Sequence, residues 1–241
     1  MNVNRPFVWS ITVACALFLS GCGDAASRSA SPRRTDDNTL VLVVTTESPP
    51  YAYVDEAGKI RGIDVEIATA AAAKLNRKLE VRATVFEELF PMVKSGQADM
   101  AGSGLTITKG RLRSVDFTIP YAEEGGAFLY RTGEPTPTMT LAESIRVATI
   151  DSTTHDLYLT RHGIDPLRYR SLDEAVRDLE RKKADAVFYD MSSLSVMAAT
   201  SNGKLATSPL VTREFFGIAV RKDFPELKTV LNEMIKERRA K

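Results

Sequence analysis

Short apolar runs alternate with helical patterns along most of this chain. Leu40–Thr45 and Ala98–Ser103 have the length and composition of buried strands, and Leu79–Val85 alternates like a strand. Between them, Ile63–Leu75 and Glu87–Ser95 have the pattern of helices. The order strand, helix, strand, helix, strand predicts a largely parallel sheet covered by helices. Asp64 lies at the start of the first predicted helix. We expect it either to cap that helix or to place a negative charge near its N-terminus.

A second unit of the same type begins after Tyr121. We expect strands at Ala127–Tyr130, Arg146–Ile150, Arg168–Arg170 and Ala184–Tyr189, and helices at Thr153–Arg161, Leu172–Arg181 and Ser192–Thr200. The chain then ends with a predicted strand at Phe215–Val220 and a predicted amphipathic helix at Leu227–Arg238. The whole pattern therefore predicts an α/β fold with two units.

The stretch Ala98–Phe117 carries the residues with the clearest chemistry. Its strand ends in small residues, among them Ser103 and Gly104, which leave room for a ligand to approach the main chain. Thr106 offers a hydroxyl, and Arg111 offers a planar guanidinium suited to a carboxylate. A small acidic ligand could bind here, and the alternative is a strand-to-turn corner with a surface arginine.

This stretch resembles the Gly-(Met/Ile)-Thr-Ile-Thr-x-x-Arg-x-x-x-Val-Asp-Phe motif of the polar amino-acid solute-binding proteins of ABC transporters. That family includes the glutamine, histidine and lysine/arginine/ornithine binding proteins. The resemblance extends over about Leu40–Lys236. Further motifs match in the same order, at Pro49–Tyr51, Gly58–Ile67, Ser95–Asp99, Lys183–Asp190 and Phe216–Val220.

The resemblance implies two Rossmann-like lobes, joined by a two-crossing hinge, as in type II periplasmic binding proteins. Lobe one would hold residues 39–120 and 216–241, lobe two would hold residues 126–210, and the hinge would lie at 120–126 and 211–216. A ligand would bind in the cleft between the lobes and favour their closure.

The resemblance also implies roles for the residues of the cleft. Arg111 would bind the carboxylate of an amino acid, assisted by Thr106 and by backbone N–H groups at Gly104 and near Thr153. Asp190, on the other lobe, would bind the ammonium group. Helix capping is an alternative role for Asp190, and for Thr153 it is a compatible one.

Aromatic residues would complete the pocket. Phe86 matches a family position at which an aromatic ring contacts the ligand, and Tyr51 lies on a loop predicted to face the same cleft; either could instead belong to the core. Ser48, Ile150 and Ser152 depart from the residues common in the family, so that an unusual or apolar amino acid is as plausible a ligand as a polar one.

The N-terminal segment predicts export and lipid anchoring. Arg5 precedes the apolar run Phe7–Leu19, which is too short to span a membrane and is typical of a signal peptide. The sequence ending at Cys22 resembles the lipobox of bacterial lipoproteins, which implies a signal peptide over residues 1–21, acyl chains such as palmitate on Cys22, and a tether over 22–38. The alternative is an ordinary signal peptide cut near Ala25 or Ala26.

The remaining composition limits partners and chemistry. The net charge of +1 gives no basic field for nucleic acid, and the only cysteines, Cys15 and Cys22, leave the mature domain without a disulfide. We expect a monomeric receptor in the cell envelope, facing the periplasm or exterior, that delivers a small zwitterion to ABC permease subunits. No cofactor or metal is expected.

Two other functions stay open. A cyclohexadienyl-dehydratase-like enzyme would need an acid or base in the cleft, for which Glu47, Glu123 and Glu124 are the acidic candidates. His155 and His162 lie on a predicted surface helix, where solvated rings are expected. A ligand-sensing accessory lipoprotein without a dedicated permease would use the same lobes.

Overall fold

The computed structural model describes residues 1 and 38–240. The predicted signal peptide, the lipidation site Cys22 and nearly all of the tether lie outside the described residues. Among the residues that are described, no helix is both long and apolar enough to cross a membrane.

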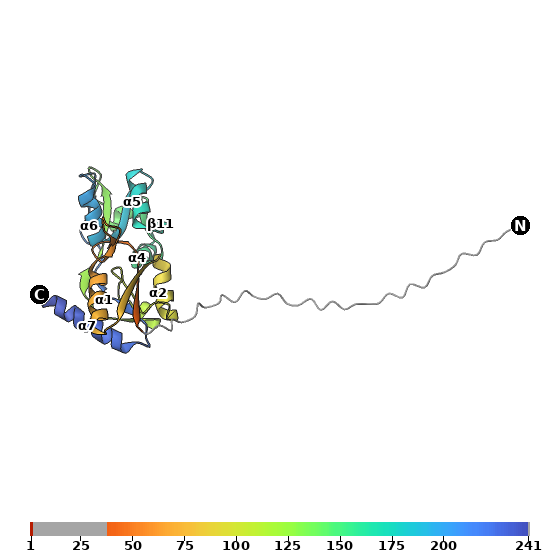
Figure 1. Cartoon of the computed structure of the whole chain (residues 1–241). Helices are drawn as coiled ribbons and strands as arrows, with labels where there is room; N and C mark the ends of the chain where they lie inside the picture. The colour runs from red at the N-terminus through yellow and green to blue at the C-terminus, as the bar shows by residue number, and fades with distance from the viewer. Residues whose placement is uncertain (2–37, 241) are drawn as a thin grey trace. The chain divides into compact units, whose positions relative to one another are not determined.

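The first lobe is built on a five-stranded sheet in the order β5-β1-β6-β15-β7. Strand β1 runs parallel to β5 and β6, whereas β15 runs antiparallel to β6 and β7. The bounds are β1 Thr39–Val44, β5 Lys78–Ala83, β6 Met100–Ala101, β7 Asp116–Phe117 and β15 Ala219–Val220. Helices α1 (Ile63–Lys74), α2 (Phe86–Ser95) and α7 (Pro225–Arg239) cover this sheet (Figure 1).

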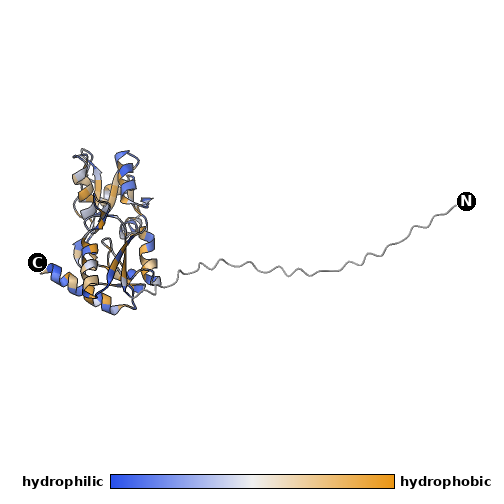
Figure 2. Ribbon diagram, viewed as in Figure 1, coloured by the Kyte–Doolittle hydropathy of each residue, from blue (hydrophilic) through white to orange (hydrophobic). Residues whose placement is uncertain are grey.

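Strand β1 explains how both faces of this sheet are buried. Its side chains point alternately to opposite faces, as in any strand. Leu40, Leu42 and Val44 pack in the cluster formed with α1 and α7, while Val41 and Val43 pack in the cluster formed with α2. Figure 2 shows the resulting apolar strands between helices whose outer faces are hydrophilic. Because β1 is buried on both faces of the sheet, a continuous run of apolar residues is the sequence expected for it.

The second lobe is built on another five-stranded sheet, in the order β11-β10-β12-β9-β13. Strand β10 is parallel to β11 and β12, but β9 is antiparallel to β12 and β13, so that the predicted parallel arrangement holds for only part of the sheet. The bounds are β9 Gly126–Arg131, β10 Val147–Ile150, β11 Leu167–Tyr169, β12 Ala186–Asp190, β13 Leu205–Thr207, α3 Met139–Ala142, α4 Thr154–Arg161, α5 Leu172–Glu180 and α6 Met191–Thr200.

Smaller elements connect and edge the lobes. Two strands, β8 and β14, form an antiparallel ladder of their own, and β2, β3 and β4 form a three-stranded sheet beside α1. A short 3-10 turn, η1, follows the loop after β6. The bounds are β2 Glu47–Ser48, β3 Ala52–Val54, β4 Ile60–Arg61, η1 Arg111–Arg113, β8 Ala122–Glu124 and β14 Glu214–Phe216.

The predicted single strand Phe215–Val220 is wrong. The structure divides it into β14, which pairs with β8, and β15, which pairs within the first sheet. Between them the backbone bonds to a different segment, because the Gly217 N–H donates to the Leu105 carbonyl at 3.0 Å. A Cβ at Gly217 would lie 3.0 Å from the end of the Ile107 side chain, so glycine fits this close approach.

Candidate functional site

The loop after β6 is shaped by a buried carboxylate. Asp64 Oδ2 accepts hydrogen bonds from the N–H groups of Ser103 at 2.6 Å and Gly104 at 3.1 Å, two residues with φ of 102° and 66°. Asp64 lies in the first turn of α1, as one of the two predicted roles requires, but it does not cap the helix, because Gly62 occupies the N-cap and the Asp64 side chain bonds to this loop instead. Burial raises the pKa of Asp64 to about 6, although the nearby Tyr121 hydroxyl and the hydrogen bonds from the Ser103 and Gly104 N–H groups oppose the shift.

Arg111 has a guanidinium with donors to spare. Its Nη1 donates to the Thr106 carbonyl at 2.8 Å, and its charge lies over the ring of Phe90, with the guanidinium carbon 4.8 Å from the centroid. No carboxylate of the described residues lies within ion-pair distance of it. Burial lowers the pKa of Arg111 to about 10, while the negative charges of Glu214 and Asp190 oppose this. The guanidinium is therefore charged at neutral pH and suited to an incoming anion.

Asp190 provides the opposite charge from the second lobe. It occupies the N-cap position of α6 but makes no side-chain capping bond, and its Oδ1 is buried without a hydrogen-bond partner. The His155 Nε2 lies 3.4 Å from that oxygen. Burial, followed by the charges of Glu214 and Glu124, raises the pKa of Asp190 well above its usual value. A cation placed here would relieve that cost.

Both charges line one small cavity between the lobes. Its volume is about 10 Å³, close to the space of one water molecule. The lining residues are Phe86, Ser103, Gly104, Thr106, Arg111, Thr153, Thr154, His155, Tyr189 and Asp190. Seven of the eight ligand-binding residues expected from the sequence are among them. An amino acid would not fit into this volume, so the lobes or side chains must move for a ligand to enter.

Tyr51 is the expected residue that does not line this cavity. Its ring packs edge-on against Phe216, with centroids 5.1 Å apart, and tilts against Tyr121 at 6.0 Å. It is 5% exposed and lies beside the loop glycine Gly104, where an added Cβ would come within 2.8 Å of the tyrosine ring. Tyr51 therefore supports the site from the core side.

Thr153 caps α4, which confirms the capping role that the sequence predicted beside its contact with an anion. Its hydroxyl accepts from the Asp156 N–H at 3.2 Å and donates to the Ile150 carbonyl at 2.7 Å. Because the hydroxyl is already used, any contact of Thr153 with an anion would come from the backbone.

The prediction that His155 is solvated is wrong, whereas His162 is exposed as expected. His155 is only 2% exposed, because it shares a helix face with the fully buried Leu159, four residues on. Its ring packs against Phe188, with centroids 5.5 Å apart. Burial lowers the pKa of His155, which favours the neutral ring, although the charge of Glu214 acts in the other direction.

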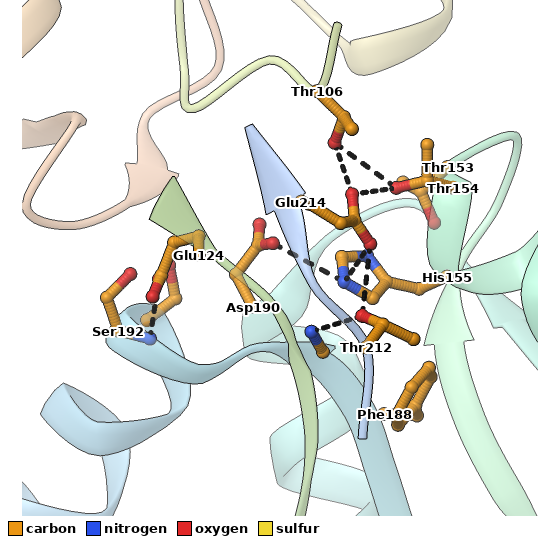
Figure 3. Close-up of polar contacts among 12 residues, drawn as sticks. Thr106, Glu124, Thr153, Thr154, His155, Phe188, Asp190, Ser192, Thr212 and Glu214 are labelled. Carbon is orange, nitrogen blue, oxygen red and sulfur yellow. Dashed lines mark hydrogen bonds and ion pairs between the residues drawn. The ribbon is translucent and has the colours of Figure 1, made fainter. Parts of the chain in front are cut away.

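Glu214 and Thr154 are site residues that the sequence reasoning missed. Glu214 begins β14, at the return crossing between the lobes, and Figure 3 shows its carboxylate between Thr106, Thr154 and His155. A sequence signal existed, since Glu214 lies inside the predicted hinge segment, where a charged side chain can reach both lobes.

Further polar contacts join the lobes around the cavity. Glu47 Oε2, in the first lobe, accepts from the Leu172 N–H at the start of α5 at 2.9 Å. The Ser193 hydroxyl, on α6 of the second lobe, donates to the carbonyl of Pro49, which follows β2 in the first lobe, at 3.0 Å. Beside the cavity, a groove of about 890 Å³ shares Thr106, Arg111, Thr153 and Thr154 with it, which gives a route from solvent.

Two α/β lobes that share one cavity, lined by Arg111 and Asp190, are the arrangement found in solute-binding proteins. The chain belongs to the bacterial extracellular solute-binding proteins, family 3, which match residues 40–241. It is 29% identical over 247 residues to a probable histidine-binding protein of Neisseria gonorrhoeae, covering 98% of this chain and 91% of the relative.

Solved structures agree with this assignment and confirm the α/β fold of two lobes. The arginine-bound form of truncated ArgBP from T. maritima has a TM-score of 0.79 and 30% identity, covering 83% of this chain and 96% of that one. An ancestral amino acid-binding protein, described as a precursor of cyclohexadienyl dehydratase, has a TM-score of 0.76 and 25% identity, covering 84% and 90%. These relatives are named as binding proteins and not as enzymes.

Proposed function

We propose that this protein captures an α-amino acid between its lobes and delivers it to an ABC importer. The observation that carries the proposal is the placement of Arg111 and Asp190. Arg111 is charged, and Asp190 is a buried carboxyl group that a cation would ionise; the two come from different lobes and line the same cavity, yet they do not pair with each other. Buried charges of this kind are costly unless a partner satisfies them. The carboxylate and the ammonium group of an amino acid would satisfy one each.

The relatives favour this class of ligand, since their names include a histidine-binding and an arginine-bound protein. We propose that the ladder of β8 and β14 is the hinge, because it links the two lobes at the crossings predicted from the sequence. Lipid anchoring at Cys22, in the cell envelope, completes the proposal. A ligand that contacts both lobes would then favour the closed arrangement over an open one.

Calorimetric titration of the mature protein with each common amino acid tests the proposal. Histidine and arginine come first in the series. Arg111→Ala is expected to cost about 2–5 kcal/mol of binding free energy, because it leaves the buried carboxylate of the bound amino acid without its cationic partner. Arg61→Ala is the matched control, since Arg61 is exposed on β4 and lines neither the cavity nor the groove beside it. Equal effects of the two variants, or no binding of any amino acid, would contradict the proposal.

The enzymatic alternative is tested separately. Wild-type protein incubated with prephenate or arogenate is expected to release no decarboxylated product. Sustained turnover that disappears in Asp190→Asn would instead favour a dehydratase. A sensing role without a permease would leave binding intact but abolish uptake by a reconstituted importer.

A further inference from the structure

The carboxylate of Glu214 bridges the two lobes. Its Oε2 accepts hydrogen bonds from the Thr106 hydroxyl of the first lobe at 2.5 Å and from the Thr154 hydroxyl of the second lobe at 2.9 Å. These two hydroxyls, called the hydroxyl pair below, also lie 3.4 Å from each other. Figure 3 shows the carboxylate and the hydroxyl pair converging from three separate elements.

The second oxygen of Glu214 is also in contact with the protein. Its Oε1 accepts from the Thr212 hydroxyl at 3.3 Å and lies 3.6 Å from His155 Nε2. Burial raises the pKa of Glu214, whereas His155, when it is protonated, and the three threonine hydroxyls act against burial, and the net shift of the pKa is downward. The side chain is only 10% exposed, so this is a buried carboxylate that is ionised at neutral pH.

A ligand carboxylate would need the same donors. The position assigned to it lies between Arg111 and the Thr106 hydroxyl, which Glu214 already uses. A hydroxyl donates a single proton, and two carboxylates that share one site repel each other. The remaining volume of about 10 Å³ also leaves no space for a second carboxylate. Occupation of the hydroxyl pair by Glu214 and by a ligand is therefore mutually exclusive.

We propose that Glu214 is an intramolecular competitor for the carboxylate-binding position of the cleft. Bound to the hydroxyl pair, it holds the lobes together, and an incoming amino acid must displace it. This inference rests on the proposed function and adds a residue that sets its affinity and ligand class. Ligands without a carboxylate, such as the amines obtained by decarboxylation of amino acids, would not have to displace Glu214.

The matched experiment uses Glu214→Ala, Glu214→Gln and the control Glu123→Ala. Glu123 is exposed on the facing strand of the β8–β14 ladder, where it pairs with Arg213. Arginine and histidine are titrated beside agmatine and histamine, which keep the side chain and the amine but lack the carboxylate. Small-angle scattering of each ligand-free protein reports how far the lobes open.

Glu214→Ala is expected to bind an amino acid about tenfold or more tightly, since the ligand no longer breaks charge-assisted hydrogen bonds to enter. Its affinity for the amine should not rise. Without ligand, its radius of gyration should exceed that of the wild type and of Glu123→Ala. Glu214→Gln keeps the size of the side chain but loses the charge, so its affinity and its radius of gyration should lie between those of the wild type and of Glu214→Ala. It also provides the test if the alanine variant does not fold.

Weaker amino-acid binding in both Glu214 variants would overturn the inference, because Glu214 would then be a ligand contact. Equal tightening for amine and amino acid would also overturn it, as would an unchanged radius of gyration. If the Glu214 variants open but no form of the protein binds any amino acid, Glu214 is only a bridge between the lobes, and both the competitor role and the proposed function fall. If the wild type binds amino acids but the Glu214 variants bind them no more tightly, the competitor role alone falls.

Discussion

Replacing Asp64 tests how the binding loop is held. In Asp64→Ala the N–H groups of Ser103 and Gly104 lose their acceptor. Leaving a buried donor unsatisfied costs about 1–3 kcal/mol. Asp64 is fully buried, so the two losses predict a destabilisation of about 2–6 kcal/mol wherever the wild-type carboxyl is protonated.

The cost of Asp64→Ala should depend on pH in a definite direction. The pKa of Asp64 is about 6 in the folded protein, against 3.8 as its ordinary value. Because the folded pKa is the higher one, the stability that the protonated group contributes is complete below about pH 3.8 and is lost as the pH rises through 6. The free-energy difference between wild type and variant should therefore shrink by about 2–3 kcal/mol between pH 4 and pH 8.

Urea denaturation followed by circular dichroism, at several pH values, measures this difference. Subtracting the variant from the wild type cancels the titration of the other groups. Asp64→Asn keeps an acceptor oxygen without a charge, so it should be less destabilising than the alanine variant at pH 4 and follow the same trend. A difference that stays constant or grows with pH would refute the reasoning, because burial would then not control the ionisation of Asp64.

Two other substitutions test parts of the fold around the cleft. Glu47→Ala removes the contact with the first turn of α5, so it should weaken amino-acid binding by about 1 kcal/mol, or fivefold. Calorimetry measures this change, and the exposed Glu56→Ala should leave the affinity unchanged. Equal effects of the two variants would exclude a role of Glu47 in closure. Gly62→Ala would place a Cβ 2.2 Å from the Tyr51 carbonyl oxygen, at a residue with φ of 127°. Its urea midpoint should therefore fall well below that of Gly133→Ala, since Gly133 has φ of 89° but open space around it. Similar midpoints would show that the backbone at Gly62 moves to accommodate the methyl group.

The local patterns of the sequence predicted the elements well where a side chain acts on its own helix or strand. The apolar run of β1 and the alanine-rich α1 are examples, because burial on both faces and helix propensity are properties of neighbouring residues. Ser103, Thr106 and Arg111 could be predicted from spacing and resemblance, and the structure brings them to one cavity.

The long-range contacts could not be predicted in this way. Asp64 has the sequence context of a helix-capping residue, but its partners are the N–H groups of residues 103 and 104, about 40 positions away in the chain. Glu214 contacts Thr106 across a separation of 108 residues. His155 could have been recognised as buried from its spacing to Leu159, and only the identity of the facing residues depends on the tertiary fold.

The ladder of β8 and β14 has a mechanical consequence. Three residue pairs bond the two crossings side by side, and Glu214 is paired with Glu124 in that ladder. Sliding of one lobe along the other would break these bonds, whereas rotation about the ladder would preserve them, so we expect a single soft direction of motion. Glu214 lies on that axis and would be displaced least as the lobes rotate. When the lobes open, Thr106 and Thr154 would therefore move away from Glu214, while Glu214 itself would stay nearly in place.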